Sequence, residues 1–78
     1  MPSRGRRSHN FVVCIHNGEY DADLVVGKIY RVVKPERNDA ASDLRILDES
    51  GEDYLYPKTW FVSVDLPLRA RKALVATQ

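Results

Sequence analysis

The stretch LRILDESGEDYLYPKTWFV, residues 44–62, decides the fold of this chain. Two apolar runs, residues 44–47 and 54–56, flank a polar turn at Ser50-Gly51, and this pattern predicts a β-hairpin. The second run stops at Pro57, which cannot donate a hydrogen bond to a neighbouring strand. A hairpin followed by a proline, a short bend and another apolar strand is typical of very small β-barrels.

Two further strands are expected before the hairpin. Residues 11–16 form a short run rich in β-branched side chains, bounded by Asn17-Gly18. Residues 24–33 form a longer run interrupted by Gly27, which indicates a bulge or a bend. With residues 61–64 after the hairpin, the chain has five short predicted strands and no long helical period among them. The sequence therefore predicts an all-β fold, a small barrel or sandwich.

Alternation along these strands predicts the core. The side chains expected to point inward are Val26, Tyr30, Val32, Leu44 and Ile46, while Arg31 and Arg45 are expected to point outward. Tyr54 and Tyr56 are expected to fill the core, with their hydroxyls reaching the surface. The remaining polar segments are expected to be solvated: a mobile loop over residues 34–43 and the hairpin-turn acids Asp48, Glu49, Glu52 and Asp53.

The pattern changes after residue 65. Asp65 is a candidate helix N-cap, Pro67 suits the first helical position, and strong helix formers follow. A helix of about three turns is marginal alone, so it is expected to pack on the barrel, pack on a partner or fray. The predicted organisation is a flexible basic arm over residues 1–10, a barrel over 11–65 and a helix over 66–78.

Length and composition limit the classes of function. A chain of 78 residues with 44% apolar residues can build one compact core but no deep catalytic cleft. Cys14 is the only cysteine, which excludes an intramolecular disulfide framework and favours a reducing, cytoplasmic location. No apolar run is long enough for a signal-peptide core or a membrane span.

Charge is segregated along the chain. Each end carries a charge of +3, whereas the body between them has six basic and eleven acidic residues, a net charge of −5. Phosphate binding requires a clustered basic surface, so the barrel itself is a poor nucleic-acid surface. Candidate phosphate-binding residues are therefore confined to the ends: Arg4, Arg6, Arg7, Arg69, Arg71 and Lys72.

The candidates for catalysis or metal binding are few. Cys14 and His16 share one face of a predicted strand, and His9 is nearby in sequence, but no further ligand or orienting carboxylate completes a metal site or an activated nucleophile. Cys14 is expected to be buried and His16 to lie at the surface end of the strand. A small enzyme would require one of them to be exposed and reactive. We expect no enzymatic activity, no cofactor and no metal.

The order of these features resembles the Src homology 3 (SH3) barrel over residues 11–65. An acidic loop precedes the Leu24-Val-Val-Gly27 segment, a distal hairpin carries the Asp48-Glu-Ser-Gly51 turn, and Pro57-Lys-Thr-Trp60 is similar to the family's Pro-x-x-Tyr one-turn 3₁₀ helix. The pattern is most similar to small bacterial SH3-like proteins of unknown role. The resemblance implies a five-stranded SH3-like barrel with a short C-terminal α-helix.

The resemblance also implies a ligand groove. Pro57 falls on the family's groove proline, Trp60 on its groove tyrosine, and Tyr20 stands for an aromatic residue of the acidic loop. Together these three residues would form an aromatic groove surface suited to an extended proline-containing or basic peptide. The neighbouring carboxylates are Glu19, Asp21 and Asp23. The paired tryptophans of peptide-binding members are replaced here by Asp43-Leu44-Arg45, which argues against proline-rich recognition.

The function expected from the sequence is a non-enzymatic binding module. Its partner is expected to be a protein, and open barrel edges or the helix could also support a homodimer, so the chain is expected to be a monomer or a homodimer. The alternative is a nucleic-acid-associated protein that binds phosphates through its basic ends. A steep salt dependence of binding would favour this alternative.

Overall fold

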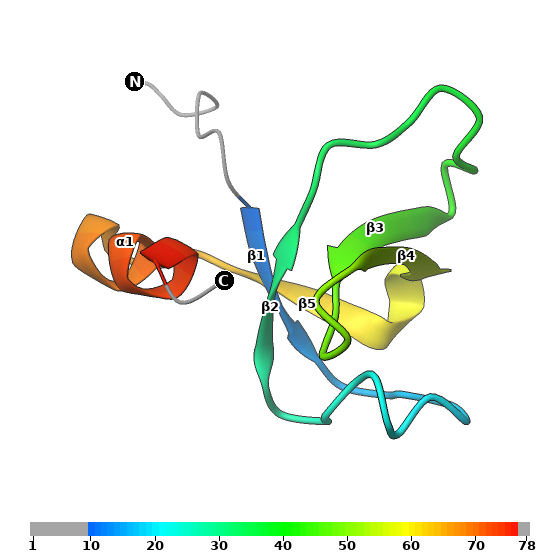
Figure 1. Cartoon of the computed structure of the whole chain (residues 1–78), viewed down its shortest axis with the longest axis horizontal. Helices are drawn as coiled ribbons and strands as arrows, with labels where there is room; N and C mark the ends of the chain where they lie inside the picture. The colour runs from blue at the N-terminus through cyan, green and yellow to red at the C-terminus, as the bar shows by residue number, and fades with distance from the viewer. Residues whose placement is uncertain (1–9, 77–78) are drawn as a thin grey trace.

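The structure, a computed structural model, describes residues 10–76 as an antiparallel sheet followed by a helix (Figure 1). The elements are β1 (Asn10–Cys14), β2 (Ile29–Val32), β3 (Asp43–Leu47), β4 (Asp53–Pro57), η2 (Lys58–Trp60), β5 (Phe61–Val64) and α1 (Leu68–Ala76). The strand order is β4-β3-β2-β1-β5. The predicted all-β class, the hairpin and the short C-terminal helix are confirmed. Arg4, Arg6 and Arg7 lie outside the described residues.

The sheet is not closed into a barrel. Its two edges are β4 and β5, and the pairings recorded within residues 10–76 leave each of them with one strand neighbour. The core lies on one face, where Leu24 from the loop between β1 and β2 joins side chains from every strand. The buried core residues are Val12, Cys14, Leu24, Tyr30, Ile46, Tyr56 and Phe61, with Val32, Leu44 and Trp60 packed against them.

Three predictions about this face are wrong. The strand expected over residues 24–33 is only Ile29–Val32, because residues 24–28 form a turn whose backbone bonds to Tyr20, Cys14 and the Tyr30 hydroxyl instead of a strand. Val26 therefore points into solvent and is 54% exposed. Tyr54, the second residue of β4, is also exposed. Tyr30, Ile46 and Tyr56 are buried as predicted.

The opposite face of the sheet is also apolar. Val13 pairs with Ile29 on one side and Val62 on the other, and Phe11 pairs with Arg31 and Val64. Strand alternation turns Phe11 and Val13 away from the core residues Val12 and Cys14. Phe11 is nevertheless only 2% exposed. This outer face is a second apolar surface, covered at Phe11 but open at Val62, whose side chain is 49% exposed.

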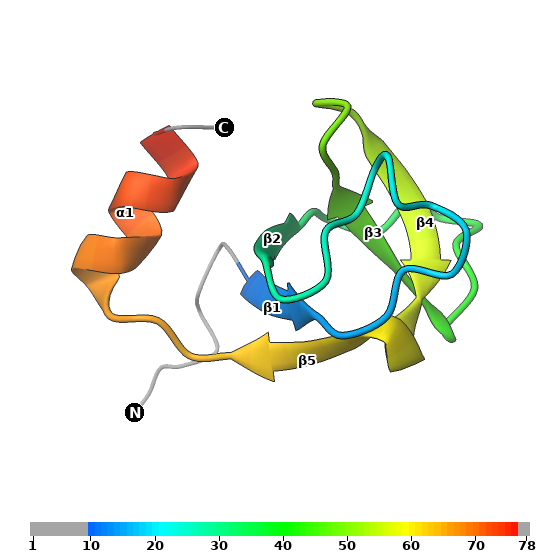
Figure 2. The same ribbon diagram turned by 90° about the horizontal axis from the view of Figure 1, so that it is seen from below.

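The C-terminal helix lies to one side of the sheet, near the start of β1 in both views (Figures 1 and 2). It begins at Leu68, two residues after the predicted start at residue 66 and one after Pro67, and the carbonyl of Pro67 accepts a hydrogen bond from the amide of Arg71. Leu68 is exposed, whereas Leu74 is half-buried. Between residues 10 and 76, no helix has the length and apolar character needed to cross a bilayer.

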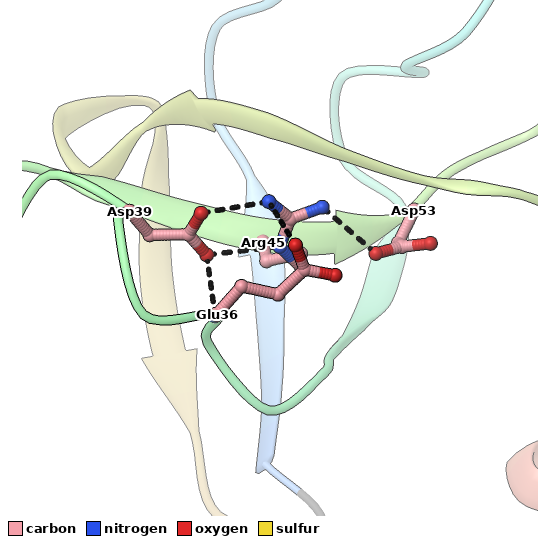
Figure 3. A network of polar contacts seen from close by, with 4 residues as sticks. All are labelled: Glu36, Asp39, Arg45 and Asp53. Carbon is pink, nitrogen blue, oxygen red and sulfur yellow. Dashed lines mark hydrogen bonds and ion pairs between the residues drawn. The ribbon is translucent and has the colours of Figure 1, made fainter.

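The loop between β2 and β3, predicted as a mobile surface segment, is tied to the sheet through Arg45 (Figure 3). Asp39 accepts two hydrogen bonds from the Arg45 guanidinium, at 2.9 and 2.7 Å, and Asp53 accepts a third at 3.0 Å. Glu36 lies 3.6 Å from the same guanidinium. Arg45 does point away from the core, as predicted, but only 15% of its side chain is exposed because these acids surround it.

This network predicts an acid-sensitive contribution to stability. The Arg45 guanidinium, followed by the Glu36 backbone amide, lowers the pKa of Asp39 to about 2 from 3.8. Because the folded-state pKa is the lower one, the stabilisation is present above pH 3.8 and is lost as the pH falls toward 2. We expect the difference in urea midpoint between wild type and Asp39→Asn to be largest at pH 5 and to shrink toward pH 2. A difference that stays constant over this range would contradict the ion-pair explanation; Asp21→Asn, at an exposed loop position, is the matched control.

Candidate functional site

The loop between β1 and β2, residues 15–28, is built to hold Tyr20 in one place. The amides of Asp23 and Leu24 both donate to the carbonyl of Tyr20, at 2.9 and 2.8 Å, and the Asn17 side-chain amide donates to the Leu24 carbonyl at 3.0 Å. Leu24 is fully buried in the core. The loop is therefore pinned at its centre, and the Tyr20 side chain projects from a fixed turn.

A second set of bonds joins this loop to the hairpin turn. The Glu49 amide donates to the Asp23 carbonyl at 2.9 Å. The Glu49 carboxylate accepts hydrogen bonds from Lys28 and from the Tyr30 hydroxyl, both at 2.6 Å, and the Val25 amide donates to that same hydroxyl at 2.7 Å. Lys28 and Tyr30 lower the pKa of Glu49, and burial, together with the bond to Glu49, raises the pKa of Tyr30. The loop and the hairpin thus form one unit.

Four aromatic rings form a row along this unit, which we call the aromatic shelf: His16, Trp60, Tyr20 and Tyr54. The centroids of successive rings are 5.3, 6.0 and 6.3 Å apart. Tyr20 and Tyr54 are 41% and 54% exposed, and His16 is exposed as well. Beneath the row lies Tyr56, which is 1% exposed and contacts the rings of Tyr20, Tyr54 and Trp60. The shelf is a continuous aromatic surface built from three separate segments.

The buried tyrosine under the shelf is fixed by Asp48. The Tyr56 hydroxyl donates to Asp48 at 2.6 Å, and the other oxygen of Asp48 accepts bonds from the Ser50 amide and hydroxyl at 2.9 and 2.5 Å. Asp48 is only 8% exposed, so the prediction that all of the turn acids are solvated is wrong. Burial, then the bond to Asp48, raises the pKa of Tyr56.

Trp60 packs directly on the backbone of Gly18. A Cβ atom added at Gly18 would lie 2.6 Å from Cη2 of the Trp60 ring, which is closer than two carbon atoms can approach without movement. Gly18 also has a φ of +56°, which favours glycine. The absence of a side chain at this position lets the outer edge of the indole ring lie against the loop.

Substitution of Gly18 therefore tests the packing of the shelf. We expect Gly18→Ala to destabilise the fold by roughly 1–2 kcal/mol in urea denaturation, partly from its positive φ and partly from the clash. Gly51→Ala is the matched control, because Gly51 has a φ of +86° but open space around it. Only Gly18→Ala should shift the emission maximum of Trp60. An identical, unshifted spectrum in both variants would show that the indole does not rest on Gly18.

The structure brings together part of the predicted site. Tyr20 and Trp60 meet in the shelf, and Glu19 and Asp21 are exposed beside Tyr20 in the same loop. Asp23 is half-buried, and its charge acts on Tyr56 beneath the shelf. Pro57 alternates with Tyr56 along β4 and so turns away from the rings. Its φ of −59° instead directs the chain into η2.

Sequence reasoning missed two members of the shelf, Tyr54 and His16. The sequence predicts Tyr54 in the core and His16 at the surface end of a strand. Spacing places Tyr54 with Tyr56 on one face of β4, and Cys14 with His16 on one face of the first predicted strand, but it does not distinguish the exposed member of each pair from the buried one. The basic helix residues lie on α1, which contributes no ring to the shelf; Arg69 and Lys72 are exposed and Arg71 is half-buried.

Cys14 and His16, the two residues considered for catalysis, lie in different environments. Cys14 is fully buried, and its thiol donates to the His16 carbonyl at 3.3 Å, while burial raises its pKa. The His16 ring instead packs edge-on against Trp60. Among residues 10–76, no group of three histidine, cysteine, aspartate or glutamate side chains is arranged to hold a metal ion.

A separate hollow of about 390 Å³ lies under the loop between β2 and β3. Its walls include Val32, Pro35, Ala40 and Leu44 together with the Arg45 network. The guanidinium of Arg45, which lines this hollow, is already bonded to Asp39 and Asp53.

Comparisons of this chain with known protein families, with curated proteins and with solved structures found no match.

Proposed function

We propose that this protein is a non-enzymatic binding module with an SH3-like fold, whose aromatic shelf binds an extended, basic segment of a protein partner. The order of elements supports the fold: an acidic loop, a hairpin with an Asp/Gly turn, and a one-turn 3₁₀ helix, η2, that leads into β5. These are the features on which the resemblance to the SH3 barrel rests. The resemblance concerns the order of these elements, while the five-stranded sheet itself stays open between its edge strands β4 and β5.

The observation that carries the functional proposal is the exposure of Tyr20 and Tyr54 in contact with each other and with the floor ring of Tyr56. Exposed rings leave apolar area in water, and contiguous patches of this kind mark interaction sites. The loop that carries Tyr20 is held by the Leu24 anchor and by Glu49, so little order has to be gained on binding.

The geometry favours an extended peptide that lies across the shelf. It disfavours a ligand that inserts a single side chain between the rings. Neighbouring ring centroids are 5.3–6.3 Å apart, so the rings already contact one another and leave no room for a group between them. Guanidinium and ammonium groups bind favourably on the faces of tyrosine and tryptophan rings. The adjacent carboxylates of Glu19 and Asp21 supply opposite charge at the rim and favour arginine or lysine in the ligand.

The test uses a labelled peptide of alternating arginine and glycine, with a peptide of the same length carrying glutamate for arginine as control. Trp60 is the only tryptophan and reports binding by its fluorescence. We expect Tyr20→Ala to weaken binding of the arginine peptide about tenfold or more, as truncation of a hot-spot ring does. Val26→Ala, an exposed apolar position in the same loop, should leave binding unchanged. Equal affinity for both peptides, or no effect of Tyr20→Ala, would contradict the proposal.

The alternative function is binding of nucleic acid through the basic ends. Arg69 and Lys72 support it within the described residues, because they are exposed and, three residues apart, lie on the same side of α1. A labelled single-stranded oligonucleotide measures it directly. Binding that falls steeply with salt, is reduced by Arg69→Ala with Lys72→Ala, and is unaffected by Tyr20→Ala would favour this function over the shelf.

A further inference from the structure

Within residues 10–76, β5 pairs only with β1, and the backbone groups on its other edge point away from the sheet. The Ile15 amide donates to the Trp60 carbonyl at 2.8 Å, and the register pairs Val13 with Val62. In an antiparallel pair, every second residue turns its amide and carbonyl toward its neighbour. Trp60, Val62 and Val64 therefore face β1. Ser63 turns its backbone amide and carbonyl to the outside, where Figure 2 shows no other labelled element along β5.

The two edges of the sheet differ in their protection against strand pairing. Natural edge strands are protected by charged side chains and by proline. β4 has both, since it begins at Asp53 and ends at Pro57. β5, with the sequence FVSV, has neither, and its Val62 side chain is 49% exposed on the apolar outer face. β5 is therefore the edge that is open to another strand.

We propose that β5 pairs with β5 of a second copy of this chain, antiparallel and centred on Ser63, to form a two-fold dimer. In this register each Ser63 exchanges its amide and carbonyl bonds with the other Ser63, and Val62 lies opposite Val64 of the second copy. The apolar outer face, which contains Phe11, Val13 and Val62, then continues from one sheet into the next. The proposal does not depend on the aromatic shelf.

A second copy fits this edge better than an unlike strand for two reasons. The strand is self-complementary, because it has no charge and places a valine on either side of the central serine. Pairing of β5 with itself also closes the assembly at two copies. Pairing of β5 with β4 of a second copy would leave both ends open, and Asp53 and Pro57 oppose it.

The experiment is sedimentation of the full chain from about 10 μM to about 1 mM, a range suited to a small and weak interface. The weight-average mass of the wild type should rise from 8.9 kDa toward twice that value. Ser63→Pro removes the outward amide without breaking a bond to β1, so it should fold and stay monomeric. Ser63→Thr keeps the amide and should dimerise like the wild type.

Folding of each variant is checked by circular dichroism and Trp60 fluorescence. If Ser63→Pro does not fold, Val62→Lys takes its place, because it puts a charge on an exposed position of the same edge. In the wild type, hydrogen exchange at the Ser63 amide should slow as concentration rises. A wild type that stays at 8.9 kDa up to about 1 mM, or a folded Ser63→Pro that dimerises as the wild type does, would overturn the proposal.

Discussion

Leu24→Ala is expected to destabilise the protein by about 2–5 kcal/mol, the range for truncation of a fully buried leucine. Leu24 is 0% exposed and belongs to the core cluster although it lies in a loop. A chain of this size has only a few kcal/mol of net stability, so the variant should lose more than about 10 °C in Tm or be largely unfolded.

The same substitution should disturb the shelf. Leu24 anchors the turn in which the amides of Asp23 and Leu24 bond to the Tyr20 carbonyl. Thermal and urea denaturation measure the stability of the Leu24→Ala variant. The control Val26→Ala, at an exposed position in the same loop, should change the free energy of unfolding by less than about 0.5 kcal/mol. If both variants unfold alike, or neither does, Leu24 does not hold the loop in the core.

Tyr56→Phe is the second large effect, with an expected loss of about 1–3 kcal/mol. The substitution removes the hydroxyl that donates to Asp48 and leaves a carboxylate oxygen buried without that partner. Tyr54→Phe is the matched control, because Tyr54 is exposed on the same strand. A double-mutant cycle of Tyr56→Phe with Asp48→Asn should give a clear coupling energy. Additive effects would show that the two side chains act separately.

The buried, hydrogen-bonded tyrosine hydroxyls should also make the stability of the protein fall at high pH. Burial and the bonds to Asp48 and Glu49 raise the pKa of Tyr56 and Tyr30 above the ordinary value of 10. Folding favours the neutral hydroxyl, so the stabilisation is present below pH 10 and is lost as the pH rises above it. When tyrosine absorbance is followed as the pH rises, Tyr30 and Tyr56 should ionise only as the protein unfolds. Tyr56→Phe should reduce the part of the absorbance change that coincides with unfolding.

The hairpin and the final strand could be predicted from sequence because local signals agree there. Alternating apolar residues, a Ser-Gly turn and Pro57 all point to the same structure, and β3, η2 and β5 follow. The loop before β2 could not be predicted in this way. Its Leu-Val-Val residues favour a strand by propensity, but the burial of Leu24 in the core and the hydrogen bond from the Glu49 amide to the Asp23 carbonyl hold a turn there instead.

The candidate site could be predicted only in part, because its burial pattern also depends on contacts between segments far apart in the sequence. Alternation shows that Tyr54 and Tyr56 share a face, but it cannot show that one is exposed and the other lies beneath Tyr20. That difference depends on where the loop crosses the sheet. Asp48 is a similar case, since its burial follows from the position of the Tyr56 hydroxyl, which no local pattern encodes.

Binding of a basic segment on the aromatic shelf can be measured by amide and indole NMR shifts during titration with the arginine-glycine peptide. Perturbations should centre on Tyr20, Tyr54 and the Trp60 indole, extend to Glu19 and Asp21, and vanish with the glutamate peptide. Perturbations confined to α1 or to the loop around Asp39, or the absence of any shift at high peptide concentration, would contradict it.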